Sequence, residues 1–150
     1  MSSYIINIVT IIIIDFERRF TLATLKYSRQ RESIQEFLNS SCEHPTADIV
    51  YMNVRQQYPN ISLGTVYRNL NLLAELGEAI KIITPNGGVH FDGRTKPHYH
   101  FTCNCCGNVY DLDMKELDCI NDAAGENFDG IISNHSLMFY GTCKNCIPEA

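Results

Sequence analysis

The sequence lacks the features that mark a secreted or a membrane-spanning protein. It has no apolar secretory core followed by a small-residue cleavage site. Its long apolar run, residues 4–14, is shorter than the roughly 20 residues that cross a bilayer. We therefore expect a cytoplasmic protein with no membrane partner, and we assign no function to residues 1–14.

Patterns typical of enzymes are also missing. There is no glycine-rich loop that would hold phosphate groups and no Ser/His/Asp arrangement of an activated nucleophile. The His-x-Glu pattern that precedes Cys-x-x-Cys in zinc deaminases is absent as well. We therefore expect neither enzymatic activity nor a small-molecule substrate.

The chain has no excess of positive charge, since its formal net charge is −5. The acidic excess is confined to the second half. Residues 15–84 contain eight Lys/Arg and eight Asp/Glu, whereas residues 85–150 contain four and nine. This asymmetry predicts two modules. A nucleic-acid interface, if present, belongs to the first module and should be strongly salt-dependent.

The first module has the sequence order of a winged helix-turn-helix. Helices are predicted at 28–40, 47–58 and 61–77, with N-caps at Ser28, Thr46 and Ser62. Residues 78–91 then predict a hairpin around Pro-Asn-Gly-Gly.

Apolar spacing predicts the buried face of two of these helices. The second helix should direct four side chains inward: Ile49, Val50, Val54 and Tyr58. The third has an apolar stripe of Val66, Leu70, Leu73 and Leu76.

A polar, hinge-like stretch at 92–97 separates this module from the second. Strands are predicted within 99–103, 108–113 and 131–143, with a helix at 115–128 between the last two. The fold class is therefore α+β, with a winged helix-turn-helix at 15–91 and a small α/β module at 98–150.

Seven cysteines are many for this length, and the odd number argues against a closed disulfide framework. Four of them form two Cys-x-x-Cys turns, Cys103/Cys106 and Cys143/Cys146. Four thiolates complete a tetrahedral shell without an open position, which predicts structural Zn²⁺. A redox dithiol is the alternative. The other three, Cys42, Cys105 and Cys119, are interpreted as ordinary thiols.

Histidines and aspartates form a second candidate set. His98 and His100 lie two apart on a predicted strand and therefore face the same side. Asp111, Asp92 and His44 would complete a mixed imidazole–carboxylate shell suited to Fe²⁺ or Mn²⁺ and compatible with Zn²⁺. Asp92 as a turn residue and His44 as a helix contact are the simpler interpretations. His90 and His135 are interpreted as structural.

Several motifs together resemble the ferric uptake regulator (Fur) family. They are RQRESI, HPTADIVY, TVYRNLNLLAELG, HYHFTCNCCG and FYGTCKNC, and the similarity extends over about residues 24–146. Residues 1–14 match nothing in that family. Within it, the chain is most similar to the peroxide-sensing branch.

The resemblance implies a role for each matching position. The positions that match the family's structural zinc ligands are Cys103, Cys106, Cys143 and Cys146. The positions that match its regulatory Fe²⁺ or Mn²⁺ ligands are His44, Asp92, His98, His100 and Asp111. Helix 62–76 matches the DNA-recognition helix, and residues 98–150 match the dimerisation domain. The candidate DNA-binding residues on that helix are Thr65, Tyr67, Arg68 and Asn71; Tyr67 could instead pack between helices.

The resemblance therefore implies a metal-dependent repressor that binds a palindromic double-stranded operator as a homodimer. Peroxide sensing would proceed by oxidation of His44 or His98. A third metal site of iron-sensing relatives would keep only Asp118 and His135 here, so we do not expect it.

Three other classes compete with this interpretation. An iron- or zinc-availability sensor of the same family would bind its metal reversibly. A zinc-ribbon module without a DNA role would leave helix 62–77 and the hairpin unexplained, and a zinc enzyme would need an open zinc position.

Overall fold

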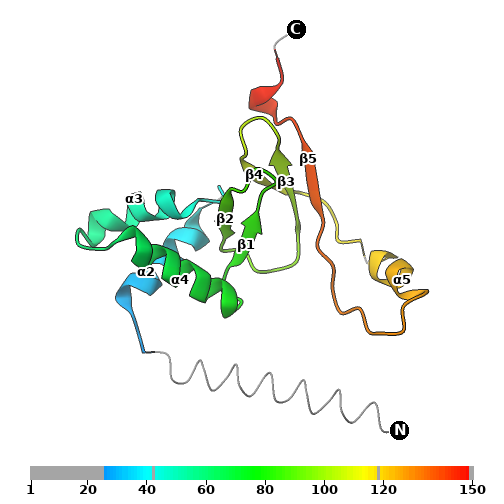
Figure 1. Cartoon of the computed structure of the whole chain (residues 1–150), viewed down its shortest axis with the longest axis horizontal. Helices are drawn as coiled ribbons and strands as arrows, with labels where there is room; N and C mark the ends of the chain where they lie inside the picture. Colours follow the sequence, from blue (N-terminus) through cyan, green and yellow to red (C-terminus); the bar gives the residue numbers. More distant parts are fainter. Residues whose placement is uncertain (1–25, 42, 118, 149–150) are drawn as a thin grey trace.

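The computed structural model describes residues 26–41, 43–117 and 119–148 (Figure 1), and residues 1–14 lie outside this range. The first group of elements comprises three helices and a hairpin. They are α2 (Arg29–Ser40), α3 (Ala47–Gln57), α4 (Leu63–Glu75), β1 (Ile80–Ile83) and β2 (Val89–Asp92). Figure 1 shows the three helices on one side of the molecule, with the antiparallel β1–β2 hairpin beside them.

Each of the three helices begins at a hydroxyl side chain, as predicted. Ser28, Thr46 and Ser62 accept hydrogen bonds from backbone N–H groups three residues further on. These bonds satisfy donors that have no partner within the helix. After α4, Gly77 adopts a positive φ of 74°, which allows the chain to leave the helix and enter β1.

The hydrophobic core lies between these helices and β2. Ile34, Val50, Leu70 and Phe91 are completely buried in it. The inward orientation predicted for Ile49 is wrong, because this side chain is 53% exposed. The buried residues of α3 recur every three or four positions, as Val50 and Val54 do. Ile49 is therefore rotated by about one hundred degrees from Val50 around the helix axis, and it lines a pocket together with residues 108–110.

The second group of elements is a three-stranded sheet with one short helix. It contains β3 (Tyr99–Cys103), β4 (Val109–Leu112), α5 (Cys119–Gly125), β5 (Met138–Gly141) and the 3₁₀ turn η1 (Lys144–Cys146). The strand order is β4-β3-β5, with β4 antiparallel and β5 parallel to β3. Together the two groups give the predicted α+β class.

The C-terminal elements are shorter than predicted. The helix expected at 115–128 is reduced to Cys119–Gly125, and the strand expected at 131–143 is reduced to Met138–Gly141. β5 pairs with β3 only opposite His100–Cys103, so residues 131–137 precede the paired stretch, on the side where β3 begins. In Figure 1, α5 stands away from the sheet on long connections. Large apolar side chains in this region remain exposed: Met114, Leu117, Phe128, Ile131, Phe139 and Tyr140.

Two close contacts hold β2 and the start of the 92–97 connection against the helical part of the first group. The N–H of Phe91 donates to the carbonyl of Pro45 at 3.0 Å, which holds the segment before α3 against β2. At Gly93, a Cβ atom would lie 2.8 Å from the backbone of Leu38, so only glycine permits this close approach of α2. No helix in the described ranges has the length and apolar character needed to span a membrane.

Candidate metal centres

The four predicted zinc ligands lie together at one end of the sheet. Cys103 ends β3 and Cys106 lies in the β3–β4 turn, whereas Cys143 immediately precedes η1 and Cys146 ends it. One ligand atom from each lies within 4.8 Å of the others, and the Sγ atoms of Cys106 and Cys143 are 3.8 Å apart. Gly107 has a positive φ of 75°, which closes the first turn. Parallel pairing of β5 with β3 brings the second Cys pair beside the first.

The surroundings of this sulfur cluster favour the thiolate form of Cys103 and Cys143, whereas hydrogen bonds with neighbouring sulfurs and burial raise the pKa of Cys146 and Cys106. Backbone N–H groups of Cys106 and Cys143 lower the pKa of Cys103 to about 6. A hydrogen bond from the Tyr110 hydroxyl lowers the pKa of Cys143. Thiolates are the form that binds metal. No disulfide joins the described cysteines, and four convergent sulfurs fit a closed tetrahedral Zn²⁺ site.

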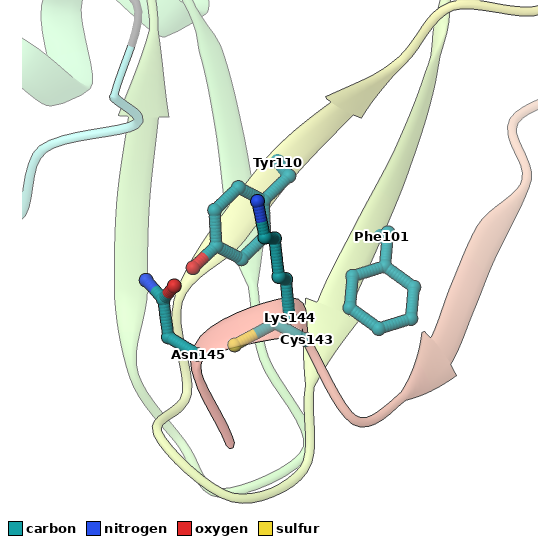
Figure 2. A pocket seen from close by; sticks show the side chains of 5 residues that line it. All are labelled: Phe101, Tyr110, Cys143, Lys144 and Asn145. Atoms are coloured by element: carbon teal, nitrogen blue, oxygen red, sulfur yellow. The ribbon is translucent and has the colours of Figure 1, made fainter. Parts of the chain in front are cut away.

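A cavity of about 380 Å³ lies next to this cluster (Figure 2). Figure 2 shows the rings of Phe101 and Tyr110, from β3 and β4, together with Cys143, Lys144 and Asn145 from the C-terminal segment. Because the lining is mainly aromatic and apolar, we regard this cavity as the flank of the sulfur cluster. It offers no second metal-binding set among the described residues.

The five His and Asp residues of the second set also converge, and they come from both groups of elements. His44 precedes α3, Asp92 ends β2, His98 immediately precedes β3, His100 lies near the start of β3, and Asp111 lies on β4. The register pairs His100 directly with Asp111 across β3 and β4. His44 is brought in by the Pro45–Phe91 hydrogen bond described above. We call these five residues the His/Asp cluster.

The three imidazoles direct their Nε2 atoms at the same two carboxylate oxygens. Nε2 of His98 lies 3.1 Å from Oδ2 of Asp92 and 3.0 Å from Oδ1 of Asp111. Nε2 of His44 lies 2.9 Å from the same Asp111 oxygen, and Nε2 of His100 lies 3.4 Å from the same Asp92 oxygen. All five donor atoms fall within 4.8 Å of one another.

Hydrogen bonds within the protein do not satisfy all of the buried imidazole nitrogens in this cluster. The buried Nε2 atoms of His44 and His98 make no hydrogen bond of acceptable geometry, although carboxylate oxygens lie 2.9 to 3.1 Å away. The other ring nitrogen of His98 donates to the carbonyl of Lys96 at 2.7 Å, which leaves the Nε2 lone pair directed into the cluster. Three imidazoles and two carboxylates around a shared point fit a divalent cation such as Fe²⁺ or Mn²⁺.

The electrostatics at His44 and Asp92 agree with a neutral imidazole and an ionised carboxylate. Burial lowers the pKa of His44, although Asp92 and Asp111 act in the opposite direction. For Asp92, burial raises the pKa, but hydrogen bonds from His100 and from the backbone N–H of Arg94 outweigh it, so the pKa is lowered overall. Both residues are therefore in the protonation state that binds a cation.

The candidate DNA-binding residues lie along one side of α4. Tyr67 and Arg68 are exposed, and Arg68 donates to the Thr65 hydroxyl at 3.1 Å. Asn71 accepts a 2.8 Å hydrogen bond from Lys81 of β1. Lys81 thus adds a positive charge to this surface that the sequence interpretation missed, although a basic residue in the predicted hairpin was a usable signal.

The remaining candidates make ordinary structural contacts. His90 lies 2.7 Å from the carbonyl of His44, and His135 contacts the Tyr99 hydroxyl at 2.6 Å and Asn121 at 2.9 Å. Neither belongs to a metal-binding group of described residues. Asp118, like Cys42, lies outside the described residues, so the third site is represented here only by His135.

Comparison with known proteins identifies the class. The sequence model of the ferric uptake regulator family matches residues 23–140. The chain belongs to this family of metal-responsive transcriptional regulators, which confirms the resemblance drawn from its motifs.

Relatives within the family include peroxide-responsive proteins. The chain is 33% identical over 141 residues to the peroxide-responsive repressor PerR of Staphylococcus epidermidis, covering 91% of this chain and 94% of the relative. The peroxide stress regulator of Campylobacter jejuni is similar in structure, with a TM-score of 0.69 and 32% identity. That match covers 78% of this chain and 88% of the other.

The fold is shared more widely. The Helicobacter pylori ferric uptake regulator, whose structure is described as having three functional metal-binding sites, has a TM-score of 0.75. At 24% identity over 92% of this chain and 93% of the other, this similarity establishes the fold.

Proposed function

We propose that this protein is a metal-dependent, DNA-binding transcriptional repressor that senses peroxide through oxidation of a histidine ligand. The observation that carries the proposal is the His/Asp cluster, in which donors from both groups of elements converge on one point. The similarity to peroxide-responsive relatives at about one-third identity supports the choice of signal.

The two clusters have different roles in this proposal. The sulfur cluster binds structural Zn²⁺, because four thiolates leave no position for another ligand. The His/Asp cluster binds the regulatory ion, Fe²⁺ or Mn²⁺. Its mixed nitrogen and oxygen donors suit both ions.

The regulatory ion would fix the orientation of the two modules, which we place at 15–91 and 98–150 with a hinge at 92–97. His44 belongs to the first module, and His98, His100 and Asp111 belong to the second. A cation that binds all of them stabilises one arrangement by RT ln(1 + [M]/Kd). Loss of a single ligand from either side weakens that link.

DNA recognition is assigned to α4 and the β1–β2 hairpin. Thr65, Tyr67, Arg68 and Asn71 form the reading surface, with Lys81 beside them. Arg side chains bind phosphates or guanine edges, and Asn binds adenine edges. The acidic second module stays away from DNA in this arrangement, since its charges repel phosphate.

A homodimer would pair two such surfaces on a palindromic operator. The exposed apolar side chains of the second module support this assembly, with Phe139 and Tyr140 on the edge strand β5 and Ile131 and Phe128 before it. Apolar patches of this kind mark association surfaces.

When held by the His/Asp cluster, Fe²⁺ would supply the electron that breaks the O–O bond of peroxide next to the imidazoles; overall, one peroxide oxygen would enter a ring C–H bond and the other would leave as water. His44 and His98 have unpartnered Nε2 atoms at the centre of the cluster, so they are the candidate targets. An oxidised imidazole is a poorer donor, and the two modules then lose their shared link. The repressor would release DNA without turnover.

Mass spectrometry of protein loaded with Fe²⁺ under anaerobic conditions and then treated with dilute peroxide tests this proposal. Peptides containing His44 or His98 should gain one oxygen atom, and Mn²⁺-loaded protein should not. His135, which is bonded to Tyr99 and Asn121, is an internal control in the same sample. Unmodified histidines with retained DNA binding would instead indicate an iron-availability sensor.

A further inference from the structure

A single residue, Arg94, restrains both carboxylates of the His/Asp cluster. Oδ2 of Asp92 faces the imidazoles, while its Oδ1 accepts a hydrogen bond from the backbone N–H of Arg94 at 2.8 Å. Oδ1 of Asp111 faces the imidazoles, while its Oδ2 lies 3.3 Å from Nη1 of Arg94. Each carboxylate thus presents one oxygen to the cluster, and Arg94 contacts the other.

We propose that Arg94 is a positioning residue that keeps both carboxylates monodentate and so leaves one coordination position for a small ligand. The inference rests on the proposed function of the cluster as the regulatory metal site. Carboxylates bind cations through one or two oxygens. Three imidazoles and two single oxygens give five donors, one fewer than an octahedral shell, whereas a bidentate Asp111 would supply the sixth.

A route for such a ligand exists on the Arg94 side of the cluster. A cavity of about 370 Å³ is lined by Arg94 together with His44, Asp92 and Asp111, and by residues at the end of α2. Its volume exceeds that of peroxide or a diatomic gas by a wide margin. A small uncharged molecule can therefore approach the two carboxylates through a cavity that Arg94 lines.

Substitution of Arg94 can remove its side-chain contact with Asp111, but not its backbone hydrogen bond to Asp92. Asp92 is buried and held by a backbone N–H, which persists whatever side chain occupies position 94. Asp111 is 35% exposed and held by the guanidinium, whose own side chain is 58% exposed. Exposed ion pairs shift an equilibrium by a factor of about five or less. Arg94→Ala should therefore free Asp111 alone, with an effect of that size.

Nitric oxide binding to the anaerobic Fe²⁺-loaded protein tests this role. The probe is uncharged, so loss of the Arg94 charge does not itself repel it. We expect Arg94→Ala to weaken nitric oxide binding by up to about fivefold. Its Mn²⁺ affinity should be equal or higher, because Asp111 can now donate two oxygens. Lys96→Ala, which removes an exposed positive charge from the same connection, is the matched control and should leave nitric oxide binding unchanged.

Three results would overturn the inference: unchanged nitric oxide affinity in Arg94→Ala, an equal loss in Lys96→Ala, or no nitric oxide binding by the unsubstituted protein. Retained zinc in Arg94→Ala shows that the second module is folded, so a loss of binding is not attributed to unfolding. The proposed function fails separately, if peroxide leaves His44 and His98 unmodified in protein that still binds nitric oxide.

Discussion

Replacing His44 should greatly reduce the increase in thermal stability that the regulatory ion gives the protein. This side chain is 3% exposed, its Nε2 lies 2.9 Å from Oδ1 of Asp111, and it is the sole cluster residue that precedes α3. His44→Ala removes one of five donors and the first module's direct link through α3. Loss of residues that merely orient a ligand already costs 10–100-fold in affinity, so we expect about 100-fold for the ligand itself.

The effect on thermal stability follows from mass action. At a Mn²⁺ concentration of about 100 times Kd, the ion stabilises the unsubstituted protein by about 2.7 kcal/mol. The same concentration would only equal Kd for the variant, which gives about 0.4 kcal/mol. For a chain of this length, each kcal/mol corresponds to about 2–4 °C in Tm. The Mn²⁺-dependent rise in Tm should therefore fall from about 5–11 °C to about 1–2 °C.

Circular dichroism melts with and without Mn²⁺ measure this difference, with zinc left in place throughout. His135→Ala is the matched control, because that histidine is bonded to Tyr99 and Asn121 outside the cluster. A full Mn²⁺-dependent rise in His44→Ala would refute the idea that the ion links the two modules through this residue.

Three further predictions concern zinc, DNA and pH. Cys143→Ser should release Zn²⁺, detectable by elemental analysis, and abolish dimerisation in sedimentation; a zinc-replete dimer would contradict the sulfur-cluster assignment. Arg68→Ala should weaken operator binding by about 1–3 kcal/mol in a fluorescence anisotropy titration, and unchanged affinity would exclude α4 as the reading helix. For the metal-free His/Asp cluster, burial lowers the pKa of His44, so the unfolded state takes up the proton first as pH falls. The free energy of unfolding should then decrease from pH 7.5 to 5.5, through the unfolded pKa of about 6.5. His44→Ala should flatten that decrease in urea titrations.

Local signals in the sequence were sufficient for the first group of elements. The hydroxyl N-caps at Ser28, Thr46 and Ser62 and the glycine at 77 fix helix ends through bonds within a few residues. Such contacts do not depend on the rest of the fold, which is why these boundaries were predictable. Ile49 was assigned wrongly because a short apolar run does not indicate which of two neighbouring positions faces the core.

The C-terminal elements were less predictable because their lengths depend on partners distant in sequence. β5 begins at Met138, opposite His100 near the start of β3, and nothing within residues 131–143 marks that limit. Exposed apolar residues such as Ile131 and Phe139 increased the apparent strand signal, although within one chain they are not buried. Their pattern fits a surface that a second copy would cover.

The sequence by itself determined the chemistry of the two centres. Spacing within each Cys-x-x-Cys turn and within His98-x-His100 is a local property, and thiolate and imidazole donors select their metals by type. The tertiary structure decided which donors meet. His44 reaches Asp92 and Asp111 because the Pro45–Phe91 hydrogen bond and the β3–β4 register place three separate segments at one point. Arg94 became visible only there, since its contacts with the two carboxylates depend on that convergence.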